Sequence, residues 1–543
     1  MTVLWHRLVL LTALVCGVAP TSPASAQVAP KKTAAQLEAE RVLRAFNCAL
    51  HNEESKFQLK RGERVQVATG GLIDHVAFPE NTKDADLIRL LPSVAKLPAL
   101  KSLDLGACKD VTEKGLKSLK VLPKLEVLLL DGSPVNGQGL KELAAVKGLR
   151  WLDISGTQLN DGDMRELGNI TSLSSLVVRG MPRLTANGIK IILNLNKIRY
   201  LDITIEKAPG EMAAALSEAK VLSALKVAPI TNSEAVHLGK MEGLDTLDLS
   251  NEDQRFGFND RKNPVQANFF NSLSDAGLDK LVGCLNLRSL DLSYVRLSGS
   301  SLGEFTKMKR LEELYLRGSA WSNAGVTKLA TMPTLRVIDL RETSVTDRAM
   351  EDLADLPTLQ RLYLAGLPLT DSGLQDLTRL RSLQVLDLSS TRVSCVRVRD
   401  MKNFSQLEHL HLAGTHITAA SFPVLGSMKS LRFLNLIDNL PEVSSTTIVP
   451  LRSELPTCLI IASDPGTPGF GFGGQIFVGW PGALYYQFYV PDVKTTAPPV
   501  VKVQPSKPLP TTTVKLPPPP PQPPAPPPIR IVPVGGGGTS GKQ

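Results

Sequence analysis

The stretch that decides the fold runs from Leu335 to Thr358 and reads LRVIDLRETSVTDRAMEDLADLPT. The next 24 residues, LQRLYLAGLPLTDSGLQDLTRLRS, repeat its leucines while the residues between them differ. The leading residue of this LxxLxL pattern recurs from Leu100 to Leu431 in steps of 22 to 25 residues, with one step of 43. Weaker copies begin at Leu72 and Leu455, which makes about sixteen units. A fixed period in this range predicts a solenoid of stacked units.

Each unit has the pattern of a short strand followed by a turn and a helix. In LRSLDLS, Leu290 and Leu292 alternate inward, and Asp291 between them is expected to face solvent. In TSVTDRAMEDLADL, Thr346 is the expected helix N-cap and Asp347 favours the positive helix end, after which apolar residues recur at helical spacing. The strands should therefore lie parallel on one face, with the helices on the other.

These motifs, together with LDLSxTxVTDxGLxxL, resemble the leucine-rich repeat family. The chain is most similar to the ribonuclease-inhibitor-like and cysteine-containing subclass and to secreted bacterial members, over residues 72–463. The resemblance implies an α/β solenoid (horseshoe) of about sixteen strand–turn–helix units, with a parallel sheet on the concave face and helices on the convex face. It implies no particular activity, because one fold hosts many functions.

The N-terminus has the layout of a secretory signal peptide over residues 1–26. Arg7 precedes an apolar run from Leu8 to Val18, and small residues lead to a cleavage site after Ala26. A lipoprotein site at Cys16 is the alternative, but the residues before it fit that signal poorly. No later run is long enough for a transmembrane span. We therefore expect export to the periplasm, the cell surface or the medium.

Three further segments flank the repeats. Residues 27–71 contain TAAQLEAERVLRAF, which predicts an amphipathic helix that caps the first unit. Residues 464–493 are rich in glycine and aromatic residues, and residues 494–543 form a proline-rich tail that we expect to be disordered. GFGFGG contains GxGxxG, but no helix pattern follows it, so a nucleotide site is not expected.

The net charge of +9 comes largely from the tail. Six cations and no acids follow Asp492, and an exported protein rarely meets nucleic acid. We therefore expect a protein or a cell-envelope polymer as partner rather than nucleic acid. The sequence leaves the oligomeric state open.

The sequence offers no cofactor, metal or catalytic motif. The cysteines that follow the signal peptide are widely spaced and form no CxxC pair, which argues against a disulfide framework or a zinc knuckle. GxSxG and HExxH are missing as well. We predict a protein that is not an enzyme.

The solvent-facing strand positions are the candidate binding surface. Aspartate occupies the middle position of most alternate strands, either as a solvated acidic ladder or as a surface for cations and basic peptides. Tyrosine and arginine, which dominate interface hot spots, gather in the C-terminal half. The predicted ligand-binding residues are Glu313, Tyr315, Arg317, Asp339, Arg341, Arg361, Tyr363, Asp387, His409, His411 and Phe433.

Two local features leave alternatives open. His409, His411 and Asp387 could together ligate zinc, but exposed recognition histidines are favoured because nothing in the sequence supplies supporting residues around such a site. The one step of 43 residues predicts an insertion at about residues 251–273. This insertion is either a loop at the rim of the concave face or an eroded repeat. Polar residues stand where the leucines of a repeat would be, which favours the loop.

The sequence thus predicts a non-catalytic leucine-rich repeat protein that binds a protein or an envelope polymer at the bacterial cell exterior or in the periplasm. The alternative is a structural scaffold of the envelope, in which the proline-rich tail provides the tether.

Overall fold

A computed structural model describes residues 32–51, 72–106, 108–204, 208–251, 271–300, 302–439 and 443–463. All of them belong to one compact unit, Met1–Gln487. The predicted signal peptide, most of the insertion, the glycine- and aromatic-rich segment and the tail lie outside the described residues. The limits of those segments stay predictions.

The described strands form one sheet. Strands β2 to β17 pair in parallel in the order of the sequence, and β1 pairs antiparallel with β2. Their bounds are β1 (Ala49–His51), β2 (His75–Ala77), β3 (Ser102–Asp104), β4 (Val127–Leu129), β5 (Trp151–Asp153), β6 (Ser175–Val178), β7 (Tyr200–Thr204), β8 (Ala224–Ala228), β9 (Thr246–Asp248), β10 (Ser289–Asp291), β11 (Glu313–Tyr315), β12 (Val337–Asp339), β13 (Arg361–Tyr363), β14 (Val385–Asp387), β15 (His409–His411), β16 (Phe433–Asn435) and β17 (Leu459–Ile461). The sixteen parallel strands match the predicted number of units.

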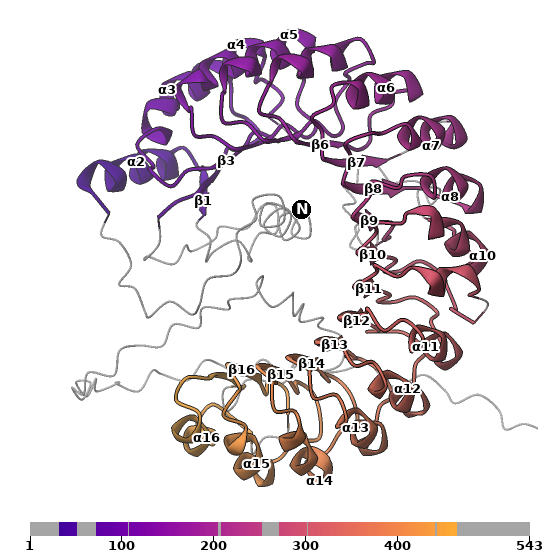
Figure 1. The fold of residues 1–543 in the computed structure, drawn as a ribbon. Helices are drawn as coiled ribbons and strands as arrows, with labels where there is room; N and C mark the ends of the chain where they lie inside the picture. Colours follow the sequence, from indigo (N-terminus) through magenta and orange to yellow (C-terminus); the bar gives the residue numbers. More distant parts are fainter. Residues whose placement is uncertain are drawn as a thin grey trace, which may run out of the picture. The chain divides into compact units, whose positions relative to one another are not determined.

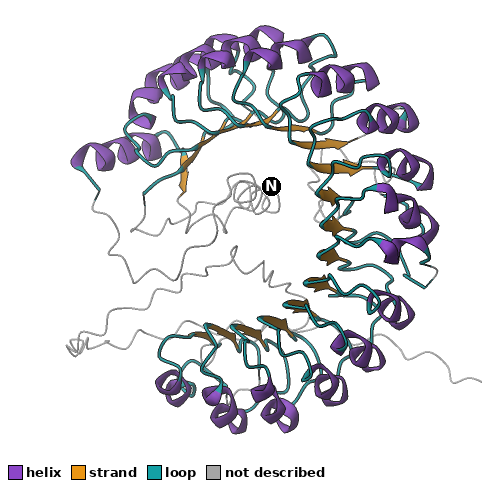
Figure 2. Ribbon diagram, in the orientation of Figure 1, coloured by secondary structure: helices purple, strands orange, loops and turns teal. Residues whose placement is uncertain are grey.

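Short helices follow most strands and lie on the outer side of the curved sheet (Figure 1). The α-helices are α2 (Ala34–Ala45), α3 (Asp84–Val94), α4 (Glu113–Ser118), α5 (Gly137–Glu142), α6 (Ala186–Asn194), α7 (Pro209–Ser217), α8 (Asn232–Leu238), α10 (Asp275–Leu278), α11 (Asn323–Leu329), α12 (Met350–Ala354), α13 (Asp371–Leu377), α14 (Cys395–Val398), α15 (Phe422–Ser427) and α16 (Val449–Glu454). The 3₁₀ turns are η1 (Leu119–Val121), η2 (Leu143–Ala145), η3 (Asp163–Asn169), η5 (Asp279–Gly283), η6 (Glu304–Lys307), η7 (Asp347–Ala349), η8 (Arg399–Asn403) and η9 (Ala419–Ser421). Strands inside and helices outside, as Figure 2 shows, confirm the predicted α/β solenoid.

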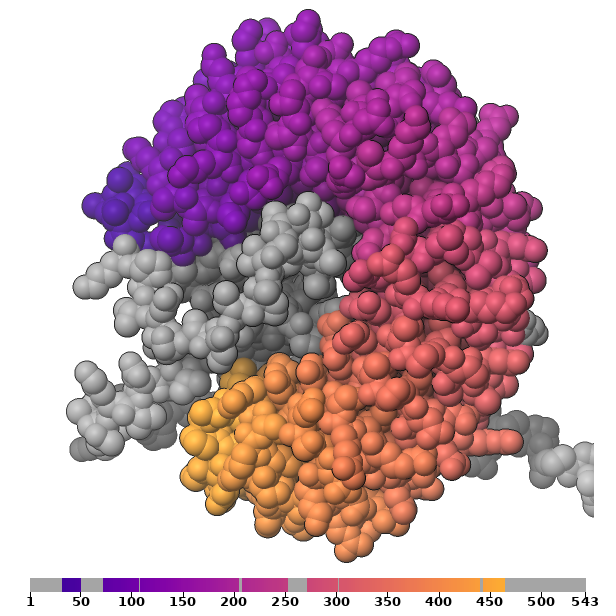
Figure 3. All heavy atoms as spheres, in the orientation of Figure 1, coloured from indigo at the N-terminus to yellow at the C-terminus, as the bar shows by residue number. Residues whose placement is uncertain are grey.

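Leucines fill the space between the sheet and the helices. Leu290, Leu292 and their counterparts are fully buried, and they belong to one apolar core that runs from Ala39 to Ile460. In the space-filling view, consecutive units contact each other along the described chain (Figure 3). A single unit has no partner for its inward leucines, so stacking provides the burial that stabilises the fold.

The predicted N-terminal helix is present as α2. Thr33 and Gln36 form a capping box at its start, with Thr33 N donating to Gln36 Oε1 at 2.6 Å and Gln36 N donating to Thr33 Oγ1 at 3.3 Å. Its apolar face buries Ala39 and Leu43 in the core shared with the first units. The helix thereby covers leucines of the solenoid's first unit.

The TD pair at the helix start links neighbouring units. Thr346 makes no side-chain cap hydrogen bond, contrary to the expectation from the sequence. Instead, the Asp347 carboxylate reaches the next unit and accepts from Thr370 N at 2.9 Å and from Thr370 Oγ1 at 2.5 Å. The same contact occurs between Asp371 and Ser394. The carboxylate therefore binds the residue at the helix start of the following unit, and we call this contact the Thr–Asp staple.

Glycine in TDSGL makes room for the staple. A Cβ atom on Gly373 would lie 2.5 Å from Asp347 Oδ1, closer than van der Waals contact allows. Gly115 is in the same situation, with Asp84 Oδ1 2.4 Å from the position of its Cβ. The glycine is needed here for the close approach of the preceding unit's carboxylate.

The insertion is closed at its base by two asparagines. Strand β9 pairs directly with β10, so no repeat strand stands between them. Asn271 N donates to Asn251 Oδ1 at 2.8 Å, and Asn251 Nδ2 donates to Asn271 O at 3.2 Å. Asn271 Nδ2 also donates to Leu249 O at 2.5 Å. These contacts tie the ends of the insertion to the β9 unit, while residues 252–270 lie outside the described residues.

Candidate functional site

The structure brings all eleven predicted site residues onto the concave side of β11 to β16. Parallel pairing aligns two rows of outward side chains across these six strands. The first row is Glu313, Val337, Arg361, Val385, His409 and Phe433, and the second is Tyr315, Asp339, Tyr363, Asp387, His411 and Asn435. Arg317 and Arg341 follow two residues after the second row. We call this surface the C-terminal concave face.

The second row is more buried than the sequence suggested. Tyr315, Tyr363 and His411 are each 6% exposed, and Asp339 and Asp387 are 2% exposed. The expectation that these side chains face solvent is therefore wrong. On the inner side of a curved sheet, side chains of adjacent strands converge and cover one another. The half-buried members of the face are Glu313, Arg317, Arg341, Arg361, His409 and Phe433.

The aspartate ladder has a structural role at the ends of the strands. Asp387 Oδ1 accepts from Ser389 N at 3.0 Å, and Asp291 Oδ1 accepts from Ser293 N at 2.9 Å. The sequence suggested aspartates that are surrounded by solvent, and this expectation is wrong. The aspartates instead accept hydrogen bonds from the backbone in the turn after their strands.

An ion pair crosses the first row. Arg361 Nη2 lies 2.9 Å from Glu313 Oε1, so it reaches past Val337 on the intervening strand. Tyr315 OH donates to Glu313 Oε2 at 3.0 Å. Val337, on the strand between the two charged residues, packs with Tyr315 and Tyr363 in a small apolar cluster. The ion pair therefore fixes the positions of both charged side chains next to this apolar cluster.

A second ion pair lies within β12 and the residues that follow it. Arg341 Nε contacts Asp339 Oδ1 and Oδ2 at 2.9 and 3.0 Å. Its guanidinium lies 5.3 Å from the centroid of the Tyr363 ring, in the geometry of a cation–π contact. Burial opposes the charge of Arg341, but the carboxylates of Asp339 and Asp387 outweigh burial and raise its pKa. Arg341 therefore stays charged.

Arg317 belongs to a third pair at the edge of the face. Its Nη2 atom lies 2.8 Å from Glu342 Oε1, and its guanidinium lies 5.7 Å from the Tyr294 ring centroid. Tyr294 and Glu342 were not among the predicted residues. Both have positive φ, 61° and 57°. Sequence pattern alone does not show that a side chain in such a turn swings toward Arg317.

Aromatic rings end the face on β15 and β16. The Phe433 ring lies 6.1 Å from the His409 ring and 5.0 Å from the His411 ring, centroid to centroid. Burial lowers the pKa of both histidines, and for His411 it outweighs the attraction of Asp387. Among the described residues, no group of three histidine, cysteine or acidic side chains is placed to hold a metal ion. The lowered pKa values keep the two histidines mainly neutral at pH 7, and both rings lie against Phe433.

Each described unit contributes one parallel strand, inward leucines and an outer turn or helix, at the spacing of the sequence repeat. The described chain is a leucine-rich repeat solenoid. Its assignment to the ribonuclease-inhibitor-like and cysteine-containing subclass stays a prediction.

Several solved structures align with this chain, with TM-scores below 0.5. Internalin F of Listeria monocytogenes aligns at 18% identity over 73% of this chain and 98% of its own, with a TM-score of 0.36. Internalin C2 of Listeria monocytogenes aligns at 26% identity over 35% of this chain and 76% of its own, with a TM-score of 0.29. TLR13, solved as a complex with ssRNA13, aligns at 18% identity over 66% of this chain and 64% of its own, with a TM-score of 0.34. The leucine-rich repeat fold of this chain follows from its own strands and inward leucines.

No family model and no curated protein matches the chain. The exclusion of nucleic acid as a partner stays a prediction. No helix among the described residues is long and apolar enough to cross a membrane.

The leucine-rich repeat solenoid carries a second concave cluster that the sequence reading missed. Trp151 and Tyr200 stack with ring centroids 4.8 Å apart, and Val127 and Val177 pack with them across β4 to β7. The available signal was the run of apolar residues at outward strand positions, as in EVLLL and RWLDI. This cluster is buried, so it stabilises the N-terminal half of the face.

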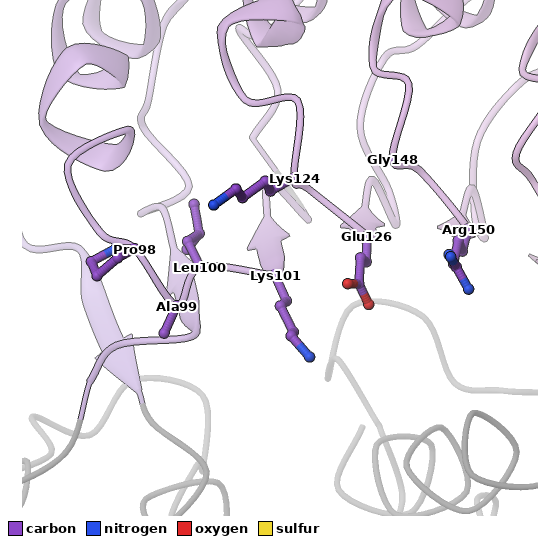
Figure 4. A pocket seen from close by; sticks show the side chains of 8 residues that line it. All are labelled: Pro98, Ala99, Leu100, Lys101, Lys124, Glu126, Gly148 and Arg150. Atoms are coloured by element: carbon purple, nitrogen blue, oxygen red, sulfur yellow. The ribbon is translucent and has the colours of Figure 1, made fainter. Parts of the chain in front are cut away.

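A hollow of about 220 Å³ opens at the rim of the solenoid beside β3 to β5 (Figure 4). Lys101, Glu126 and Arg150, which each precede a strand by one residue, project side by side there, and Lys124 lies nearby. The three cations are exposed and Glu126 is half-buried. The hollow is therefore a solvated rim of the leucine-rich repeats with mixed charge.

The five cysteines of the described solenoid carry free thiols. Cys48, Cys108 and Cys284 are buried, and burial raises the pKa of each to about 12. Thiols with such pKa values remain protonated at neutral pH and are poor nucleophiles. These three cysteines therefore act as small core residues.

Proposed function

We propose that this leucine-rich repeat chain is a non-catalytic binding protein of the bacterial cell exterior or periplasm. It engages a protein partner through the C-terminal concave face. The observation that carries the proposal is a set of half-buried charged and aromatic side chains on four of the strands from β11 to β16 and in the turns after β11 and β12. Extended concave surfaces of this kind are what repeat proteins use for binding.

The arrangement of these side chains supports binding more than catalysis. Arg361 is held by Glu313, and Arg341 is held by Asp339. Side chains already fixed by ion pairs lose little conformational entropy when a partner covers them, which favours affinity. Carboxylates that neutralise guanidinium groups are poorly placed for proton transfer. Phe433 adds half-buried aromatic area of the kind that interface hot spots use.

The test compares two matched double variants of the full chain. Glu313→Ala with Arg361→Ala removes an entire concave ion pair, so that neither charge is left unpaired. Asp355→Ala with Arg379→Ala removes a pair of 3.7 Å on the helical side as a control. Proteins captured from an envelope extract of the source cells are quantified by mass spectrometry, and Kd is measured for the captured partner. The concave variant should bind about 2 kcal/mol more weakly, and the control should bind as wild type.

A chain that lacks residues 494–543 separates binding from scaffolding. The proposal expects this deletion to leave partner affinity unchanged. Retained affinity in the concave variant, together with release from envelope fractions on tail deletion, would replace the binding role by the scaffold role.

A further inference from the structure

We propose that the C-terminal concave face contains a site for a single ammonium group, the side-chain end of a lysine on the protein partner. The site consists of Asp387 and three polar side chains beside it, Tyr363, Ser389 and His411, which we call the Asp387 cluster. The proposal rests on the proposed function and specifies which chemical group of the partner the face recognises.

The first observation is a set of unfilled hydrogen-bonding atoms. Tyr363 OH, Ser389 Oγ and His411 Nδ1 are buried and have no hydrogen-bond partner within the described chain. The exposed fractions of these residues are 6%, 8% and 6%. Native proteins satisfy nearly all buried polar atoms, so three neighbouring exceptions need an explanation. A ligand that fills all three supplies one.

The second observation is the position of these three residues around Asp387. Tyr363, Asp387 and His411 are register partners on the adjacent strands β13, β14 and β15. Neighbouring strands lie only about 4.8 Å apart. Ser389 N donates to Asp387 Oδ1 at 3.0 Å, so Ser389 stands beside the same carboxylate. The three residues that carry the unfilled atoms therefore flank Asp387 on both neighbouring strands and in the turn after its own strand.

The third observation is the charge balance. The ion pairs of Arg341 with Asp339 and of Arg361 with Glu313 occupy the two nearby guanidinium groups. Asp387 forms no ion pair with any described residue, and burial keeps His411 neutral at pH 7. Arg341 acts on Asp387 only at longer range, so one negative charge is left over. A buried carboxylate without a counter-ion is unfavourable, and a bound cation offsets it.

The chemistry of the cluster favours lysine over other cations. Two hydroxyls and a neutral imidazole can each accept a hydrogen bond, and an ammonium group offers three donors and no acceptor. Little of the cluster is exposed, so the group must arrive on a narrow stem. The four-carbon chain of lysine provides one, whereas a guanidinium is a broad planar fork. The amine of an amino sugar is attached directly to the ring, which is too broad to accompany it to side chains that are this buried.

The test uses the full chain with ¹⁵N-labelled histidine and follows the His411 Nδ1 resonance by NMR. The probes are N-acetyl-lysinamide, N-acetyl-norleucinamide, which lacks the ammonium, and glucosamine for the amino-sugar source. Asp387→Asn removes the charge and keeps the turn, because Asn435 at the same position of β16 accepts from Ile437 N at 3.1 Å. Asp291→Asn, four strands away on β10, is the matched control.

Lysinamide should shift His411 Nδ1 saturably in wild type and in Asp291→Asn. Asp387→Asn and Tyr363→Phe should each weaken this binding about tenfold or more, as the loss of a charge-assisted hydrogen bond predicts. Norleucinamide should cause no shift.

Equal binding of lysinamide and norleucinamide, unchanged affinity in Asp387→Asn, or no binding to wild type would each overturn the site. Glucosamine binding as tight as lysinamide would overturn lysine as the source and indicate an amino-sugar polymer. A protein partner whose affinity survives Asp387→Asn but falls in the Glu313–Arg361 double variant would leave the proposed function standing and remove only the ammonium site.

Discussion

Replacing Asp347 by alanine should break one Thr–Asp staple and destabilise the solenoid by about 2 kcal/mol. The carboxylate accepts two hydrogen bonds from Thr370, at 2.9 Å from the backbone N and at 2.5 Å from Oγ1. Both residues are half-buried, so water can replace part of the lost interaction. At about 1 kcal/mol net for each bond, the loss comes to roughly 2 kcal/mol of unfolding free energy.

Asparagine at position 347 is the matched control, and the chain contains its precedent. Asn323 makes the equivalent contact one unit earlier, accepting from Thr346 N and donating to Thr346 Oγ1, both at 2.9 Å. Asp347→Asn should therefore keep both hydrogen bonds and stay within about 0.5 kcal/mol of wild type. The difference between the two variants measures the staple apart from the charge.

Urea unfolding followed by circular dichroism, with linear extrapolation, measures both free energies. The slope of free energy against urea should be the same in both variants, because neither changes the surface exposed on unfolding. Equal losses for alanine and asparagine would show that the charge at the helix start matters and the staple does not. No loss for alanine would refute the staple altogether.

Leu386→Asp places a charge in the fully buried core and should cost more than 3 kcal/mol of unfolding free energy by the same assay, whereas loss below 1 kcal/mol would contradict the strand register. Burial and the nearby Asp131 raise the pKa of Asp153 from 3.8 to about 6, so the stability that this group contributes below pH 3.8 is lost as pH rises through about 6. In thermal unfolding, the free energy of unfolding of Asp153→Asn should therefore equal that of wild type near pH 4 and exceed it by up to about 3 kcal/mol at pH 8. Asn271→Ala leaves the backbone N–H of Ile230 and the carbonyl of Leu249 without their side-chain partner and should lower Tm by several degrees, and an unchanged Tm would mean that the base of the insertion contributes no stability. N-terminal sequencing of native protein should begin at Gln27, and a native chain that begins at Met1 would defeat the export argument.

The sequence alone was enough to determine the repeat. Inward leucines such as Leu290 and Leu292 recur at a fixed period, and only stacked units can bury them. The hydrophobic effect is non-directional, so the free energy of burial does not depend on which neighbouring leucine each one contacts. The α/β class, the number of strands, the parallel order and the eleven residues of one concave face therefore followed from spacing. The helical turn that starts at Asp347 was also predicted, although the partner of this aspartate was not.

Only the tertiary structure decided what the outward side chains do. Arg361 finds Glu313 across an intervening strand, 48 residues away in the chain, and Asp387 binds a backbone N–H where the sequence suggested a solvated charge. Trp151 meets Tyr200 across β6 in the same way. Hydrogen bonds and ion pairs depend on distance and angle, and the curvature of the sheet sets both. That curvature is a property of many stacked units together, so no single repeat records which of its polar atoms are paired and which are left open.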